Sequence, residues 1–332
     1  MNLHPRHGNR PATFVAMLGA VSPGIAGAHG FGQRYDLPLP LTLYLCGAAL
    51  TVTLSCVMLL VFVRAPRDTA RFDLLAHPAT RWLAAPAMVA GLRLLAVALY
   101  LLLLVAGFIG NQSPFRNVVP ITVWALWWVG LAYFSVVAGD LWRVANPLET
   151  LFAAADRAYA RMRPGKHLSL ERPAPAWLQS WPALVLYVVF LWMETAWDGA
   201  DVPARIAAAI LLYSILTWSG MAVYGRDAWL AHGEVFTRVF GLLARFSPTE
   251  ITLRDRRIAA LALRPYAVGL LTHTPADRSE IALVVTILAA VSFDGFLETP
   301  AWASVNEALA PDGDGAVALR TAALVEIGRA HV

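Results

Sequence analysis

Long apolar segments recur along this chain, and each approaches or exceeds the length needed to cross a lipid bilayer. A spanning α-helix takes about 20 predominantly apolar residues. Charged residues make up only 14% of the 332 residues, against about 25% in soluble domains. The sequence therefore predicts an all-α, polytopic transmembrane bundle with about six complete spans, at residues 40–63, 87–110, 118–141, 182–197, 204–225 and 281–297.

The first 28 residues have the layout of a secretory signal peptide. Arg6 and Arg10 precede a short apolar stretch at residues 12–21, and the small residues at 26–28 form a cleavage motif. We therefore expect cleavage after residue 28, which makes His29 the first residue of the mature chain. An uncleaved anchor helix is the alternative.

A further apolar run begins at Ala316 and stops after about ten residues, roughly half a membrane crossing. Residues 326–332 follow it, and their sequence is similar to the translation of a short sequencing adapter. We expect a truncated seventh span, with the transmembrane domain at 29–325 and an adapter scar at 326–332.

Arginine and lysine alternate between rich and poor loops along the chain. The rich loops follow residues 63, 141 and 225, and the poor loops follow residues 110, 197 and 297. The positive-inside rule places the rich loops in the cytoplasm. His29 and the acidic turn with Asp198 and Asp201 then lie outside, on the side to which a signal peptide would deliver the mature N-terminus.

The formal net charge of +4 is accounted for by these cytoplasmic loops, so we expect no nucleic-acid partner. The bilayer is the expected partner, and a second membrane protein or a homo-oligomer remains open. Residues 228–246 carry apolar side chains at helical spacing, interrupted by Arg238 and Arg245. This pattern predicts a cytoplasmic helix that lies on the membrane interface or dips into it.

Acidic residues gather on the external side, and one histidine joins them. Asp198 follows Glu194 by four residues, and Glu298 follows Asp294 by four, each pair at the outer end of a span. Residues four apart share a helix face, and acids within spans usually face a bundle interior or a watery cavity. If the two helices touch, His29, Glu194, Asp198, Asp294 and Glu298 form an oxygen-rich site for a divalent metal. Helix caps, ion pairs with nearby arginines and a polar pore are the alternatives.

Several segments, taken in order, resemble the bacterial membrane proteins named fenitrothion hydrolases. The resemblance extends from residue 29 to about residue 324 and is carried by residues 29–38, 141–147, 175–183, 229–236 and 292–296. It implies a multi-pass protein of the bacterial inner membrane with a periplasmic N-terminus. It also implies hydrolysis of an organophosphorus triester with release of a nitrophenol.

Two functional hypotheses follow. In the first, Glu194 and Asp294 are the catalytic residues of a membrane phosphotriester hydrolase and hold a divalent metal whose bound water attacks phosphorus. In the second, the chain is a non-enzymatic membrane component that binds metal ions or supports a partner subunit. The sequence does not identify the metal or the physiological substrate.

Overall fold

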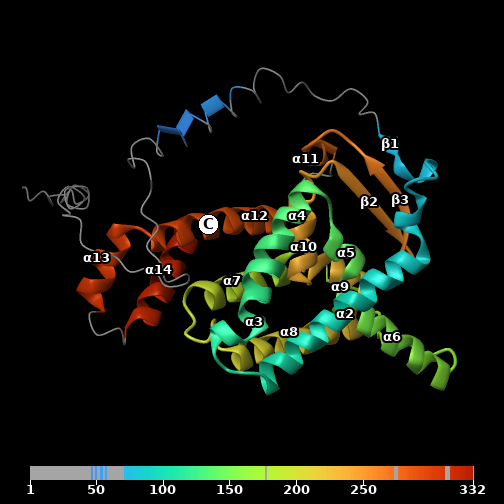
Figure 1. Ribbon diagram of the computed structural model, residues 1–332, viewed down its shortest axis with the longest axis horizontal. Helices are drawn as coiled ribbons and strands as arrows, with labels where there is room; N and C mark the ends of the chain where they lie inside the picture. The colour runs from blue at the N-terminus through green and yellow to red at the C-terminus, as the bar shows by residue number, and fades with distance from the viewer. Residues whose placement is uncertain are drawn as a thin grey trace, which may run out of the picture.

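The protein is mostly helical (Figure 1). The computed structural model describes residues 71–175, 178–272, 276–310 and 315–331, together with single positions between 46 and 57. The predicted signal peptide, His29 and most of the predicted span at 40–63 lie outside the described residues.

Four helical segments within the described ranges are long and apolar enough to cross a membrane. They are α2 (Pro86–Ile109), the continuous helix at 118–137, α8 (Pro203–Tyr224) and α12 (Arg278–Leu297). The second consists of α3 (Val118–Ile121), the π-helical η5 (Thr122–Val129) and α4 (Gly130–Val137). All four fall at predicted spans, so the chain is an integral membrane protein.

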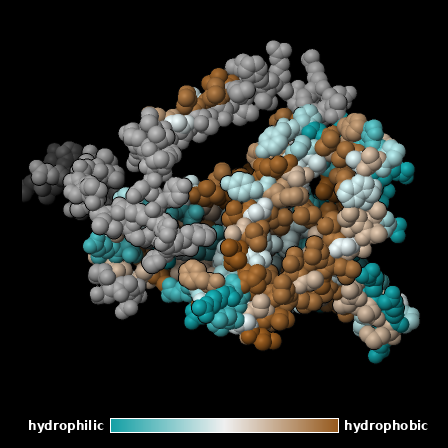
Figure 2. Space-filling view, viewed as in Figure 1, coloured by the Kyte–Doolittle hydropathy of each residue, from teal (hydrophilic) through white to brown (hydrophobic). Residues whose placement is uncertain are grey.

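The surface of these helices is suited to lipid. Leu94, Leu99 and Leu102 of α2 are exposed, as are Leu212 and Ile215 of α8. Figure 2 shows the resulting apolar surface over the region where α2 and α8 lie. Apolar patches of this extent are rare on soluble monomers, and bilayer hydrocarbon would cover them.

The predicted span at 182–197 forms a shorter helix, α7 (Trp181–Thr195). At 1.5 Å per residue its 15 residues reach about 22 Å, less than the hydrocarbon core of a bilayer. The helix ends at Thr195, and the chain then turns at residues 197–201. Its buried face, with Ala183, Tyr187 and Leu191, belongs to the main core.

The segment at 228–246 is two helices rather than one. Gly225 adopts a φ of 92°, which glycine tolerates best, and the chain reverses there into α9 (Arg226–His232) and then α10 (Val235–Leu243). The ring of Phe236 lies 4.4 Å from that of Trp127 and 5.3 Å from that of Tyr213, which sits midway along α8. The predicted interfacial helix thus enters the bundle and supplies part of its core.

A three-stranded antiparallel sheet corrects the all-α prediction. Its order is β1 (Phe72–Asp73), β3 (Arg257–Leu263), β2 (Thr249–Arg254). Asp255 and Arg256, both at positive φ, form the two-residue turn between β2 and β3, as is typical of tight hairpins. The sheet was missed because its arginines were assigned to a loop and its alternation of apolar residues is short.

The remaining elements connect or extend the bundle. α14 (Ala316–His331) packs against α12 and α7 and continues as a helix across the boundary predicted at residue 326. Figure 1 shows α6 projecting from the body. These elements are η2 (Leu74–Ala76), η3 (Arg81–Ala84), η4 (Pro114–Arg116), α5 (Leu141–Ala145), α6 (Pro147–Met162), α11 (Gly269–Thr272), α13 (Pro300–Leu309) and α14 (Ala316–His331).

Candidate functional site

The two catalytic acids predicted from the sequence lie on neighbouring helices. The amide of Ser180 donates a 2.8 Å hydrogen bond to Oγ of Ser279, which sets the starts of α7 and α12 side by side. The helices pack against each other, and Glu194 and Asp294 lie near their far ends. The condition on which the predicted site depended, contact between these two helices, is therefore met.

The surroundings of the two carboxylates differ. Glu194 is half-buried near the end of α7. Asp294 is exposed on α12 but close enough for its charge to act on Glu194. The pair therefore lies between the main core, which α7 helps to form, and the exposed surface of α12.

The other predicted ligands do not complete a metal site within the described part of the chain. α7 ends at Thr195, so Asp198 lies in the following turn and does not share a helix face with Glu194. Glu298 is the C-cap residue of α12 and is exposed. Among the residues described, no three His, Cys, Asp or Glu side chains gather closely enough to hold a metal. The fifth predicted ligand, His29, lies outside the described residues.

Three polar residues cap the starts of helices. Each lies within, or one residue before, a segment that resembles the fenitrothion hydrolases. Asp140 accepts from the amide of Arg143 at the start of α5. Asn146 accepts from two amides at the start of α6, and Glu234 does the same for α10. Because a cap satisfies amides that have no partner within the helix, these residues explain where three helices begin.

Glu234 is also a buried anchor between elements. Its carboxylate is fully buried and accepts hydrogen bonds from Nε1 of Trp142 at 3.2 Å, from the Tyr213 hydroxyl and from the amide and hydroxyl of Thr237. A buried charge is tolerated when it is fully hydrogen-bonded. Glu234 thus fastens α10 to α5 and α8.

A second polar region lies at the other end of the bundle, where the hairpin meets α6. The guanidinium of Arg256 donates to Oε1 of Glu149 at 2.7 Å, and Nε of Arg226 lies 3.8 Å from the same oxygen. Arg93 donates to the carbonyls of Val144 and Arg256. The tip of the hairpin is therefore held between α2 and α6.

Crowding of like charges is evident here. Burial lowers the pKa of Arg256 to about 10; Glu149 opposes this shift, and the positive charges of Arg93 and Arg226 add to it. Burial likewise raises the pKa of Glu149 against the attraction of its arginines. The arginines outnumber the carboxylate on which they converge.

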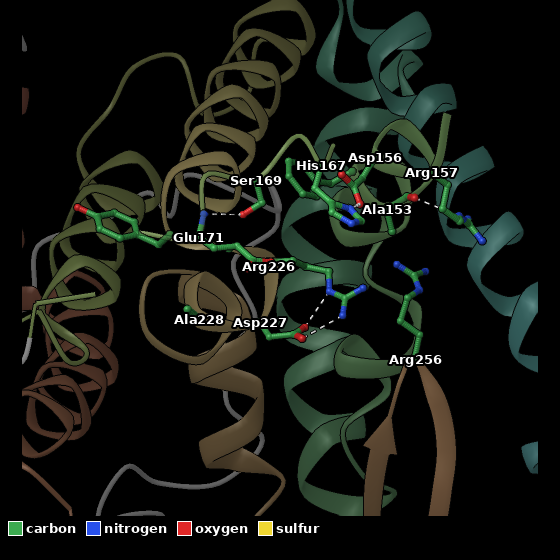
Figure 3. Close-up of a pocket in the computed structure, with 13 residues that line it drawn as sticks. Ala153, Asp156, Arg157, His167, Ser169, Glu171, Arg226, Asp227, Ala228 and Arg256 are labelled. Carbon is green, nitrogen blue, oxygen red and sulfur yellow. Dashed lines mark hydrogen bonds and ion pairs between the residues drawn. The ribbon is translucent and has the colours of Figure 1, made fainter. Parts of the chain in front are cut away.

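Two cavities, with volumes of about 460 Å³ and about 440 Å³, adjoin this cluster. Both are lined by Arg226, Asp227 and Arg256. Figure 3 shows the first, with the His167–Asp156 pair above Arg226 in the view. Nδ1 of His167 lies 3.1 Å from Oδ2 of Asp156. Sequence reasoning missed this region, because its members come from distant parts of the chain and match no spaced motif.

Comparison of the chain with protein-family profiles, with curated proteins and with solved structures gave no match.

Proposed function

We propose that this integral membrane protein hydrolyses organophosphorus triesters at the Glu194–Asp294 pair. The observation that carries the proposal is the packing of α7 against α12, which brings together two acids 100 positions apart in the sequence. Acids in membrane helices are costly and usually functional. The resemblance to fenitrothion hydrolases supplies the substrate class.

The chemistry requires a base, an approach for the substrate and a good leaving group. A carboxylate of the pair takes a proton from water as the water oxygen forms its bond to phosphorus. The phosphorus–oxygen bond to the aryl group breaks, and the nitrophenolate leaves with the electron pair, which gives a phosphodiester. General-base help of this kind contributes about 10²–10⁴ in rate.

An apolar triester partitions into the bilayer, so a site open to lipid receives it directly. Leu288 and Val291 are exposed on the same helix as Asp294 and offer an apolar approach. In this proposal the carboxylates take the proton from water; a divalent metal held by the same two side chains would supply a more acidic water.

The test uses the full-length protein purified in detergent and assayed for nitrophenol release from fenitrothion. Glu194→Gln and Asp294→Asn should each lower kcat/KM about 10²-fold or more. The matched control is Glu307→Gln, an exposed acid on α13, which should retain the wild-type rate. Unchanged rates in the Glu194→Gln, Asp294→Asn double variant would remove the pair from the reaction, and no release by the wild type would remove the function.

A second function is favoured by the exposure of Asp294 on an apolar helix face. A carboxylate facing hydrocarbon is unfavourable, and a second membrane protein could cover it. In this alternative the chain is a non-enzymatic component that supports a partner subunit. Co-purification of a stoichiometric partner, lost in Asp294→Leu and accompanied by no hydrolysis, would favour it. A metal-binding component would instead retain a divalent metal, and elemental analysis of the wild type and His29→Ala would show whether His29 holds it.

A further inference from the structure

The cavity in Figure 3 lies at the end of the molecule opposite Glu194 and Asp294, and it is built from four elements. α6 and the loop after it form one wall, the junction of α8 and α9 forms another, and the turn of the β2–β3 hairpin contributes Arg256. Its volume of about 460 Å³ is within the range of small-molecule sites.

The acids in the lining are already engaged or screened. Asp156 accepts from the amide of Leu168 at 2.7 Å and contacts His167. Asp227 accepts two hydrogen bonds from the guanidinium of Arg226, at 2.8 and 3.0 Å. Glu171 is exposed to solvent, where salt screens its charge.

The cations in the lining retain free donors. The side chain of Arg157 donates to the carbonyl of Ala153 and has no ion pair with an acid within the described residues. Arg226 pairs with Asp227 and Arg256 pairs with Glu149, but each pair leaves N–H donors of the guanidinium unused. Each guanidinium has five N–H donors, and Ser169 adds a hydroxyl to the lining.

The depth of the cavity indicates where a ligand would come from. Tyr224 lines it and is the last residue of the membrane span α8, so the cavity lies at the level of the lipid headgroups. Phe152 adds apolar surface. By the positive-inside rule this end is cytoplasmic, and that leaflet carries anionic lipids.

We propose that this cavity binds the phosphate group of an anionic ligand, with Arg157, Arg226 and Arg256 as its donors. Planar guanidinium groups match phosphate oxygens in geometry and charge. An anionic phospholipid headgroup and a soluble phosphate compound share this chemistry. The inference is independent of the proposed hydrolase, because no residue of the cavity belongs to the carboxylate pair.

The experiment uses the full-length protein, freed of lipid in detergent, with two probes. Inorganic pyrophosphate is titrated at constant ionic strength while thermal unfolding is followed. Phosphatidylglycerol and phosphatidylcholine are compared by native mass spectrometry after reconstitution in nanodiscs. Saturable binding of pyrophosphate, or retention of phosphatidylglycerol over phosphatidylcholine, is the expected result, and the two arms distinguish the soluble source from the lipid.

Arg157→Gln should weaken that binding about tenfold, as expected for one charge-assisted hydrogen bond. Arg254→Gln is the matched control and should bind like the wild type. Arg254 is exposed on the β2–β3 hairpin, which also carries Arg256, but it lines neither cavity. Ser169→Ala provides a milder test should Arg157→Gln fold poorly. Saturable binding of neither probe, or equal weakening by Arg157→Gln and Arg254→Gln, would overturn the proposal.

Discussion

Asp140 shows how one residue can serve the fold at an electrostatic cost. It caps α5 through the amide of Arg143, just beyond the end of the span at 118–137. Burial raises its pKa from 3.8 to about 6, although the backbone and the charge of Arg143 oppose the shift; the charge of Glu234 adds to it. The folded protein thus takes up a proton there more readily than the unfolded chain.

The contribution of Asp140 to stability depends on pH. Between pH 3.8 and about 6 the folded state binds more protons than the unfolded state, so this residue's contribution to stability falls as pH rises. Asp140→Asn retains a capping side chain and removes the charge. We expect it to raise Tm at pH 7.5 and to flatten the change in Tm between pH 4 and 6. An unaltered profile of Tm against pH in detergent would contradict this.

Arg264 is a buried cation whose hydrogen bonds lie at the C-terminal end of α10. Its guanidinium donates to the carbonyls of Ala244 and Ser247, at 3.0 and 3.2 Å, and only 6% of the residue is exposed. Arg264→Met removes the donor of the Ser247 carbonyl and one of two donors of the Ala244 carbonyl, which also accepts from the Ser247 amide, so we expect a loss of about 1–3 kcal/mol of stability. Faster hydrogen exchange at residues 244–268 would report it. Arg254→Met, an exposed change, should leave both measurements unaltered.

Among the elements, the contact of α2 with α8 depends on one glycine. A Cβ added to Gly107 would lie 2.4 Å from Cβ of Ala207 and 2.9 Å from the carbonyl oxygen of Pro203. No side chain fits there without moving the backbone, so Gly107 sets how closely the two spans approach. Small residues allow such contacts in membrane proteins, where van der Waals packing drives helix association.

We therefore expect Gly107→Ala to lower stability by about 1–3 kcal/mol through overpacking. Gly91, in the same helix, has no atom within 4 Å of an added Cβ. Gly91→Ala should be neutral or slightly stabilising, because alanine favours helix over glycine. Thermal unfolding of both variants in one detergent gives the comparison. Equal effects would show that helix propensity, and not the α2–α8 contact, decides the outcome.

At the scale of the whole molecule, the two ends of α8 separate two chemically different regions. The turn at 197–201 precedes its first residue, Pro203, and the arginine cluster surrounds its last, Tyr224. From the positive-inside rule we expect the arginine end to lie in the cytoplasm. On that expectation, the acidic turn and the Glu194–Asp294 pair lie on the opposite side of the membrane.

Labelling from outside intact cells tests this orientation. In a background without Cys46 and Cys56, an impermeant maleimide should label Asp198→Cys and should not label Asp255→Cys, which lies at the hairpin turn. Permeabilised cells provide the control, in which both variants should react. Labelling of Asp255→Cys alone in intact cells would reverse the proposed orientation.

The sequence predicted four of the long spans at their observed positions, because hydropathy sums over residues that are contiguous in the chain. Of the predicted site, the structure brings Glu194 and Asp294 together and leaves Asp198 in a turn. Asp198 lies apart from Glu194 because α7 ends at Thr195. The prediction assumed that the helix continues through Asp198, and the spacing of residues does not show where a helix ends.

By itself, the sequence determined that this chain belongs in a membrane and that its charges alternate from end to end. Only the tertiary structure decided which charges meet. Glu149 and Arg256 are 107 positions apart, and Arg256 belongs to a hairpin that the sequence did not indicate. The reason is physical: apolar length is a local property, whereas an ion pair depends on where two distant segments are placed by packing.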